Sequence, residues 1–505
     1  MRKNLKIDSG FDSRRALKTG NRIPNEIGRD RWALLHNELI LLFLPNLNLF
    51  ARKGKLLDRR DLALVCGRVR ILCSRNMQNV DLIVKNAGQL ITCASPSGPK
   101  RGNDMQDVGM IADGAVAVSG EKIVAVGKTN EIIRDFEADE IIDAGGKVVC
   151  PAFVDPHTHI VFAGDRLNEF ELKIKGTDYL EILASGGGII STVRQTRGAS
   201  VGELVAAARS RLDKMLACGT GTVEIKTGYG LDAETELKML EVIAQLDKIH
   251  PTDIVPTFLA AHAMPPEYKD NADGYVDLIC SEMLPKAWDW YEASHFPAKG
   301  TPFFADVFCE RNAFDLEQSR RILETAGGLG FGLKAHVDQF TNLGGAALAI
   351  KTGATSIDHL DTISEEEIKQ LAASGTVGVV IPTENFSAGK MQFADARKMI
   401  DAGCAVAIST DYNPGSAPCP SQSMAMAIAC RYQKLLPSEA LNAATINAAH
   451  AVGLGKRTGS IEVGKQAGLL VLETKDYREI VYEFGWNLVD RVIKRGTTQF
   501  NYLIR

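Results

Sequence analysis

Two histidines separated by one residue, His157 and His159, end an apolar run that begins at Val148. In an extended strand the side chains alternate between two faces, so both imidazoles can converge on one metal ion. The run is too apolar for an exposed edge strand, and a buried parallel strand delivers such groups at its carboxyl end. The pair is therefore typical of a metal site, although a surface strand could carry the same spacing by chance.

Other polar groups follow similar apolar runs. His262 follows residues 254–261, His336 follows 332–335, His359 follows 356–358, and Asp411 follows 406–410. A metal ion held by three neutral imidazoles and one carboxylate keeps an open position and lowers the pKa of water towards about 7. A carboxylate ligand can also accept the proton of that water, and a nearby histidine can polarise a carbonyl. This set favours hydrolysis of a C–N bond.

The elements that would position these groups alternate between strand and helix patterns. Strand-like runs cover residues 148–154, 222–225, 254–259, 304–308, 332–335, 356–357, 377–381 and 406–408, and helical patterns cover 201–218, 234–246, 316–327, 365–374 and 394–402. Eight such strands predict an α/β fold, a (β/α)8 TIM-like barrel with its functional groups at the carboxyl ends of the strands. A doubly wound open sheet is the alternative, but its G-x-G-x-x-G fingerprint is missing after the first strand.

Short β patterns occupy both ends of the chain. We expect residues 79–146 and 449–505 to form one small β-sandwich domain, and residues 147–448 to form the barrel. Residues 1–78 are an N-terminal extension of unknown role. Its apolar stretch, residues 32–50, predicts a short amphipathic helix or a partner-binding segment, and a poorly ordered extension is the alternative. Polar residues and a proline interrupt this stretch, so no membrane span is expected.

Composition limits the class of partner and the compartment. A chain of 505 residues suits a large barrel with an accessory domain, and a formal net charge of -4 gives no reason to expect nucleic acid. The ten cysteines form no C-x-x-C pair, which is typical of reduced thiols in a cytoplasmic protein.

The chain resembles the metal-dependent amidohydrolase superfamily and, within it, the imidazolonepropionase family. The resemblance spans roughly residues 80–500. It is carried by the strings HTHIVFAGDR (157–166), SGGGI (185–189), EIKTGYGL (224–231), ETELKML (234–240), AH (261–262), HVDQ (336–339), DHL (358–360) and DYNPGS (411–416).

This resemblance implies a substrate, a cofactor and a set of site residues. The reaction would hydrolyse the ring C–N bond of 4-imidazolone-5-propanoate to N-formimidoyl-L-glutamate in histidine degradation. The cofactor would be one divalent or trivalent metal ion per subunit, zinc or iron, and the protein would be a homodimer. The implied metal ligands are His157, His159, His336 and Asp411, the catalytic residues are His359 and Asp411, and the substrate contacts are Arg166, Tyr229, His262, Gln339, Asn413, Gly415 and Ser416.

Individual residues refine these roles. Arg166 offers a planar fork of donors that suits a propionate carboxylate. Gln339 stands where many relatives carry Glu, so we expect an orienting hydrogen bond there rather than acid–base chemistry. Lys226 lies near a strand end where some amidohydrolases place a carbamylated lysine between two metals, but the resemblance to a one-metal family argues against that modification.

Two alternatives stay open at this point. The chain could be another cyclic amidohydrolase or an aminohydrolase such as a deaminase, which would release ammonia, although Arg166 and Tyr229 count against it. It could also be a non-catalytic amidohydrolase-like scaffold. A scaffold would be free to lose metal ligands, and none is missing here.

Overall fold

The computed structural model describes residues 77–176 and 187–501. Contacts divide the chain into residues 1–75 and residues 76–505, and everything below concerns the second unit. The predictions for the N-terminal extension, including residues 32–50, lie outside the described residues except at its last two positions, 77 and 78. Ser185 and Gly186 of the glycine-rich string also lie outside them.

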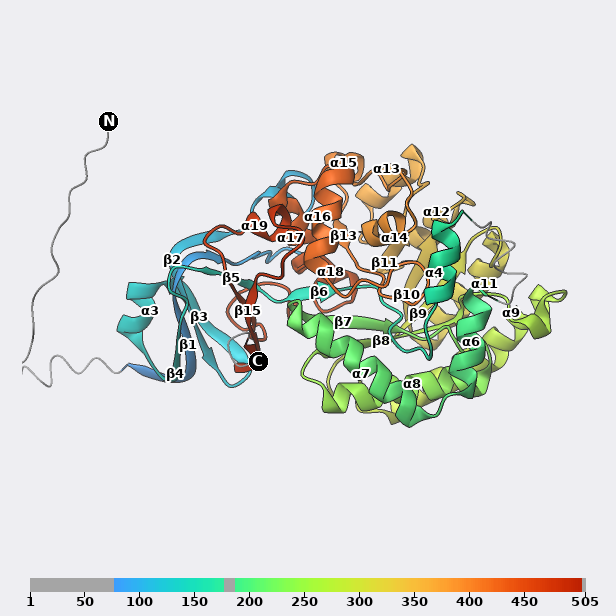
Figure 1. The fold of residues 1–505 in the computed structure, drawn as a ribbon, viewed down its shortest axis with the longest axis horizontal. Helices are drawn as coiled ribbons and strands as arrows, with labels where there is room; N and C mark the ends of the chain where they lie inside the picture. The colour runs from blue at the N-terminus through green and yellow to red at the C-terminus, as the bar shows by residue number, and fades with distance from the viewer. Residues whose placement is uncertain (1–76, 177–186, 502–505) are drawn as a thin grey trace, which may run out of the picture. The chain divides into compact units, whose positions relative to one another are not determined.

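The middle of the chain forms an eight-stranded parallel barrel surrounded by helices (Figure 1). In chain order its strands are β6 (Phe153–Asp155), β7 (Thr220–Lys226), β8 (Asp253–Ala261), β9 (Phe304–Cys309), β10 (Gly332–Val337), β11 (Ser356–His359), β12 (Val377–Val380) and β13 (Val406–Ile408). After the last strand, His159 N donates to Tyr412 O at 3.0 Å, which joins the segments that follow β6 and β13. The predicted TIM-like barrel is confirmed.

Helices follow the strands at the predicted positions. These are α7 (Val201–Ala217), α8 (Ala233–Ile249), α11 (Leu316–Leu329), α13 (Glu365–Ala373) and α15 (Ala396–Asp401). Their starts have a local cause: Ser200 and Glu203 form a capping box at α7, and Ser364 and Glu367 form another at α13.

Further α-helices lie in the same unit. They are α3 (Thr129–Asp135), α4 (Leu167–Ile174), α6 (Ile189–Gly198), α9 (Ala272–Leu278), α10 (Leu284–Ala293), α12 (Gly345–Lys351), α14 (Pro382–Ser387), α16 (Gln422–Tyr432), α17 (Pro437–Ala443), α18 (Ile446–Ala451) and α19 (Glu479–Tyr482). Among the described helices, none is both long enough and apolar enough to cross a membrane.

Segments from both ends of the unit share a second, mixed sheet. Its strands are β1 (Gln78–Ile91), β2 (Met110–Ser119), β3 (Lys122–Lys128), β4 (Phe136–Asp143), β5 (Val148–Pro151), β14 (Gly468–Leu472), β15 (Val489–Lys494) and β16 (Thr497–Asn501). Antiparallel pairing of β5 with β14 brings the two segments together. Leu82, Val116 and Leu469 belong to a core cluster of this sheet, consistent with the predicted β-sandwich domain.

One predicted strand, residues 148–154, is in fact two. β5 pairs with β1 and β14 in the mixed sheet, whereas β6 pairs with β7 in the barrel. The chain changes sheets where Ala152 N donates to Gly468 O and Phe153 N donates to Gly219 O. The prediction of a single barrel strand was wrong because both pieces are buried, so the apolar pattern continues across the change of partner.

Candidate metal centre

The carboxyl ends of the barrel strands bring the predicted metal ligands together. The Nε2 atoms of His157 and His159 lie 3.2 Å apart. Asp411 Oδ1 lies 3.6 Å from the first and 3.5 Å from the second. The rings of His157 and His336 have centroids 4.4 Å apart, and His359 follows at 5.2 Å from His336. All five side chains are buried.

Carboxylates on the far side of two rings fix which nitrogen faces the centre. Asp358 Oδ2 accepts from His157 Nδ1 at 2.6 Å, and Asp306 Oδ1 accepts from His336 Nδ1 at 3.0 Å. Each Nε2 is therefore left with its lone pair, as metal-ligating histidines require.

The atoms that face the centre fit a metal ion. Within the described residues, His336 Nε2 and Asp411 Oδ1 are buried without a hydrogen-bond partner. Unpartnered buried polar atoms are costly, and one cation would satisfy both of them and could also bind His157 Nε2, which lies 3.6 Å from Asp411 Oδ1. Nitrogen donors with one carboxylate oxygen suit zinc or iron. This set of donors can therefore hold such an ion.

Burial controls the protonation of the cluster. It lowers the pKa of His157, His159 and His359 well below the usual range, and the charge of Lys226 lowers the pKa of His157 further. The imidazoles are therefore neutral and able to bind a cation. Burial also raises the pKa of Asp411 well above its usual value. A bound cation would reverse that shift, because it stabilises the carboxylate.

A buried ionic network supports the histidines from below. Lys226 Nζ lies 2.7 Å from Asp306 and 2.9 Å from Glu224, while Lys334 Nζ lies 3.1 Å from Glu224. Burial opposes the charge of Lys226, but Asp306, Glu224 and Asp358 raise its pKa overall. A lysine held as an ammonium between carboxylates does not offer the neutral amine that carbamylation needs.

Two of the predicted substrate residues, Tyr229 and His262, lie beside this cluster. His262 stacks on His159 with centroids 4.8 Å apart, and Tyr229 lies 5.4 Å from His262. His262 Nδ1 lies 3.0 Å from Gly228 O, and burial lowers the pKa of His262 to about 3. A neutral His262 can offer hydrogen bonds without a full charge. Gln339 is half-buried just beyond β10.

The loop after Asp411 is stabilised from within. Asn413 Oδ1 accepts from the amides of Gly415 and Ser416 at 2.7 and 2.8 Å, and Asn413 Nδ2 donates to Asp411 O at 2.8 Å. Both amides therefore already have an acceptor. A Cβ on Gly415 would lie 1.9 Å from Arg166 Nη1, so Arg166 and this loop are in direct contact.

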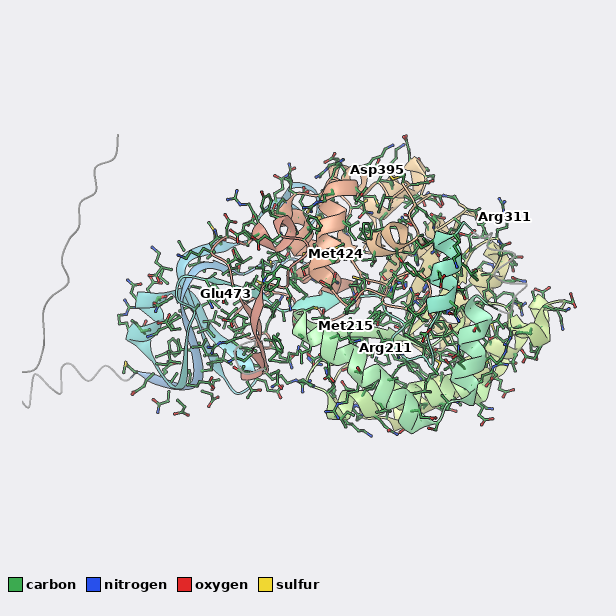
Figure 2. The ribbon with its side chains drawn as sticks, in the orientation of Figure 1. Arg211, Met215, Arg311, Asp395, Met424 and Glu473 are labelled. Atoms are coloured by element: carbon green, nitrogen blue, oxygen red, sulfur yellow. The ribbon has the colours of Figure 1, made fainter. Side chains whose placement is uncertain are left out.

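A second arginine, Arg211, holds the segment of chain that leads to Arg166. Arg211, labelled in Figure 2, lies on α7, and its Nη1 donates to Ile160 O at 2.8 Å and to Phe162 O at 2.9 Å. Its guanidinium lies 3.4 Å from the centre of the Phe162 ring. These contacts hold the segment between His159 and Arg166.

Several supporting residues escaped the sequence prediction. Glu236 accepts from Gly228 N, Gly230 N and Leu231 N at 2.7–2.9 Å, and so clasps the backbone on both sides of Tyr229. Asp306 and Lys334 were also missed. Their signal is a charged residue inside an otherwise apolar strand, in Phe304–Cys309 and Gly332–Val337.

Known proteins share this sequence and fold. The amidohydrolase family description matches residues 321–498. An imidazolonepropionase of Chloroflexus aggregans is 54% identical over 420 residues, which is 83% of this chain and 98% of that protein. One from Herpetosiphon aurantiacus is 51% identical over 420 residues, 83% of this chain and 97% of its own length.

Solved structures agree on the fold. A zinc-bound adenosine deaminase from Xanthomonas campestris matches with a TM-score of 0.62 at 21% identity, covering 84% of this chain and 94% of its own. The guanine deaminase of E. coli matches with a TM-score of 0.59 at 16% identity, covering 83% and 98%. At these identities the likeness shows the amidohydrolase fold alone.

Proposed function

This chain belongs to the imidazolonepropionase family of amidohydrolases, and from that premise we propose how its residues open a cyclic amidine. The family's reaction hydrolyses the ring C–N bond of 4-imidazolone-5-propanoate and gives N-formimidoyl-L-glutamate. The observation that carries the proposal is the convergence of buried donor atoms from His157, His159, His336 and Asp411, of which His336 Nε2 and Asp411 Oδ1 have no hydrogen-bond partner among the described residues.

These four residues would hold one divalent or trivalent ion, zinc or iron. Such an ion supplies a Lewis acid that lowers the pKa of water and polarises a carbonyl oxygen. The site is anchored from behind by Asp306 and Asp358, which keep His336 and His157 in the ligating tautomer.

Asp411 and His359 would move the protons. The Asp411 carboxylate, through the oxygen that does not face the metal ion, would accept a proton from the attacking water as the water oxygen bonds to the ring carbonyl carbon. When the C–N bond breaks, the leaving nitrogen must gain a proton, which Asp411 can return. His359, neutral and beside His336, would donate a hydrogen bond to the carbonyl oxygen. Water thus adds its OH to carbon and its H to nitrogen.

The remaining predicted residues would bind the rest of the substrate. Arg166 would pair with the propionate carboxylate. Tyr229 and His262 would hydrogen-bond the ring, Gln339 would orient it, and the loop of Asn413, Gly415 and Ser416 would contact the substrate. In this arrangement the carboxylate anchors one end of the substrate while the carbonyl faces the metal ligands.

Product analysis tests the function. Purified full-length protein should consume 4-imidazolone-5-propanoate and form N-formimidoyl-L-glutamate, identified by mass spectrometry. A His157→Ala variant should form none. Release of ammonia in place of that product would instead make the protein an aminohydrolase.

We further propose a cytoplasmic homodimer. All eight cysteines in the described part of the chain are free thiols, which supports a reducing compartment. Light scattering of the purified protein would test the dimer, which a monomer mass would exclude.

A further inference from the structure

We propose that Glu169 is a positioning residue that holds Arg166 in the orientation needed to bind the substrate carboxylate. This inference rests on the proposed function, because it takes Arg166 as the propionate anchor. Glu169 lies in the first turn of α4, just after Arg166, and its side chain is 7% exposed.

Glu169 binds one edge of the Arg166 guanidinium. Its Oε1 accepts from Arg166 Nε at 2.9 Å, and its Oε2 accepts from Nη2 in a second, short hydrogen bond. A guanidinium has five N–H donors in a fixed plane. The pairing with Glu169 uses two of them and leaves both Nη1 donors and one on Nη2. The outer edge, formed by Nη1 and Nη2, can therefore donate two parallel hydrogen bonds to a second carboxylate.

Gly415 restricts the same guanidinium from the opposite side. An added Cβ at Gly415 would lie 1.9 Å from Nη1 and 2.6 Å from the central carbon of the group. Lys173 Nζ donates to Gly415 O at 3.2 Å and lies 3.8 Å from Glu169 Oε2. Arg166 is thus held between a carboxylate and the backbone of the loop that follows Asp411.

A second element fixes Glu169 itself. Its Oε1 also accepts from Gly188 N at 2.6 Å, directly before α6. Burial opposes ionisation of Glu169, but the bonds from Arg166 and Gly188 and the charge of Lys173 lower its pKa overall. Arg166 and Lys173 are two cations and Glu169 is one carboxylate. Together they carry a single net positive charge, which matches the one carboxylate of the substrate. Preorganised donors bind more tightly because less freedom is lost on binding.

The test is the effect of Glu169→Gln on binding and turnover measured separately. Glutamine keeps the size but cannot accept from both Arg166 nitrogens with a full charge. We expect KM for the imidazolone to rise about tenfold with kcat within about threefold of wild type, because the lost interaction binds substrate and transition state alike. Glu171→Gln is the matched control: Glu171 lies on the same helix, is exposed, and pairs with Lys175. It should leave KM unchanged.

Three further arms separate positioning from folding. In an Arg166→Lys background, Glu169→Gln should add little, because residues that act as a unit are non-additive. With the propionamide analogue, which lacks the carboxylate, Glu169→Gln should not change KM. Gly415→Ala serves as a second variant in case Glu169→Gln folds poorly. Its added methyl group would displace the Arg166 guanidinium and should raise KM in the same way.

Binding of imidazole-4-propanoate, which has no ring carbonyl to hydrolyse, gives a readout independent of turnover. Its Kd by calorimetry should rise about tenfold in Glu169→Gln. An unchanged or lower Kd, or an equal rise in KM for the amide analogue, would overturn the inference. Wild-type protein that binds this anion but leaves the imidazolone intact would refute the proposed function alone.

Discussion

Each of two proposed metal ligands depends on a carboxylate behind its ring. Asp306 Oδ1 accepts from His336 Nδ1, and its Oδ2 lies 2.7 Å from Lys226 Nζ. Asp358 serves His157 in the same way. The carboxylates hold the rings in one tautomer, and the lysines balance the buried negative charge. The chemistry of the centre therefore depends on residues that do not face it.

Asp306→Asn should weaken the metal site without removing a ligand. An amide keeps the shape but loses the charge that orients His336 and pairs with Lys226. We expect the affinity for zinc to fall about 10- to 100-fold, the usual range for the loss of an orienting partner. Competition with a chelating dye measures the zinc affinity. Asp289→Asn, at an exposed position on α10, is the control. Zinc affinity equal to that of wild type would refute this role of Asp306.

The sequence could identify the histidines but not these orienting carboxylates. His157, His159, His336 and His359 stand out because polar residues end apolar runs. Asp306 pairs with His336 only because β9 and β10 are neighbours, and no local pattern states which strands are adjacent. Asp358 meets His157 across 201 residues of sequence.

Buried glutamates hold two of the loops that follow the barrel strands by accepting hydrogen bonds from their backbone amides. Glu236, in the first turn of α8, accepts from three backbone amides around Tyr229. Glu310, just after β9, accepts from Phe340 N at 2.9 Å and Thr341 N at 3.0 Å, directly beyond Gln339. Each ties a residue proposed to contact the substrate to a neighbouring element.

Glu236→Gln should loosen the loop that carries Tyr229. The amide cannot accept from all three donors, so part of the backbone is left unpaired in a buried place. We expect a loss of about 1–3 kcal/mol in the free energy of unfolding, together with a higher KM. Urea denaturation and steady-state kinetics measure the two effects. Full stability with an unchanged KM would contradict the proposed clasp.

Strand and helix positions were largely predictable, whereas the change of sheet at residue 152 was not. Capping boxes and apolar periodicity are local and mark where elements lie. Partner choice is set by distant segments: β5 pairs with β14, more than 300 residues away. An apolar run that stays buried on both sides of the change gives no local signal of it.

At the scale of the molecule, an ionic contact joins the barrel to the mixed sheet. Asp253 begins β8, and Lys494 Nζ at the end of β15 lies 2.6 Å from its Oδ2. Arg495 also pairs with Asp253. Burial opposes the charge of Asp253, but these two cations lower its pKa to about 2. The pairing therefore favours the ionised, folded form.

Removing Asp253 should destabilise the protein in a pH-dependent way. Asp253→Asn leaves Lys494 buried without its partner and should cost about 3 kcal/mol. A folded pKa below the unfolded value of about 3.9 means the contribution is complete above that pH and is lost as pH falls towards 2. The free energies of unfolding of wild type and Asp253→Asn, measured with urea, should differ by a constant amount from pH 7 to 5, and this difference should shrink below pH 4. A difference that grows on acidification would contradict this account.

We propose that this barrel holds one metal ion on which ring opening depends. The most direct measurement follows metal content and turnover of 4-imidazolone-5-propanoate together, as a chelator strips the protein and zinc or iron is returned. We expect turnover to rise linearly with the metal content and to reach its maximum at one ion per chain. The His157→Ala variant should show neither bound metal nor turnover. Full turnover in protein stripped of metal, or metal-loaded protein that leaves the imidazolone unchanged, would contradict the claim.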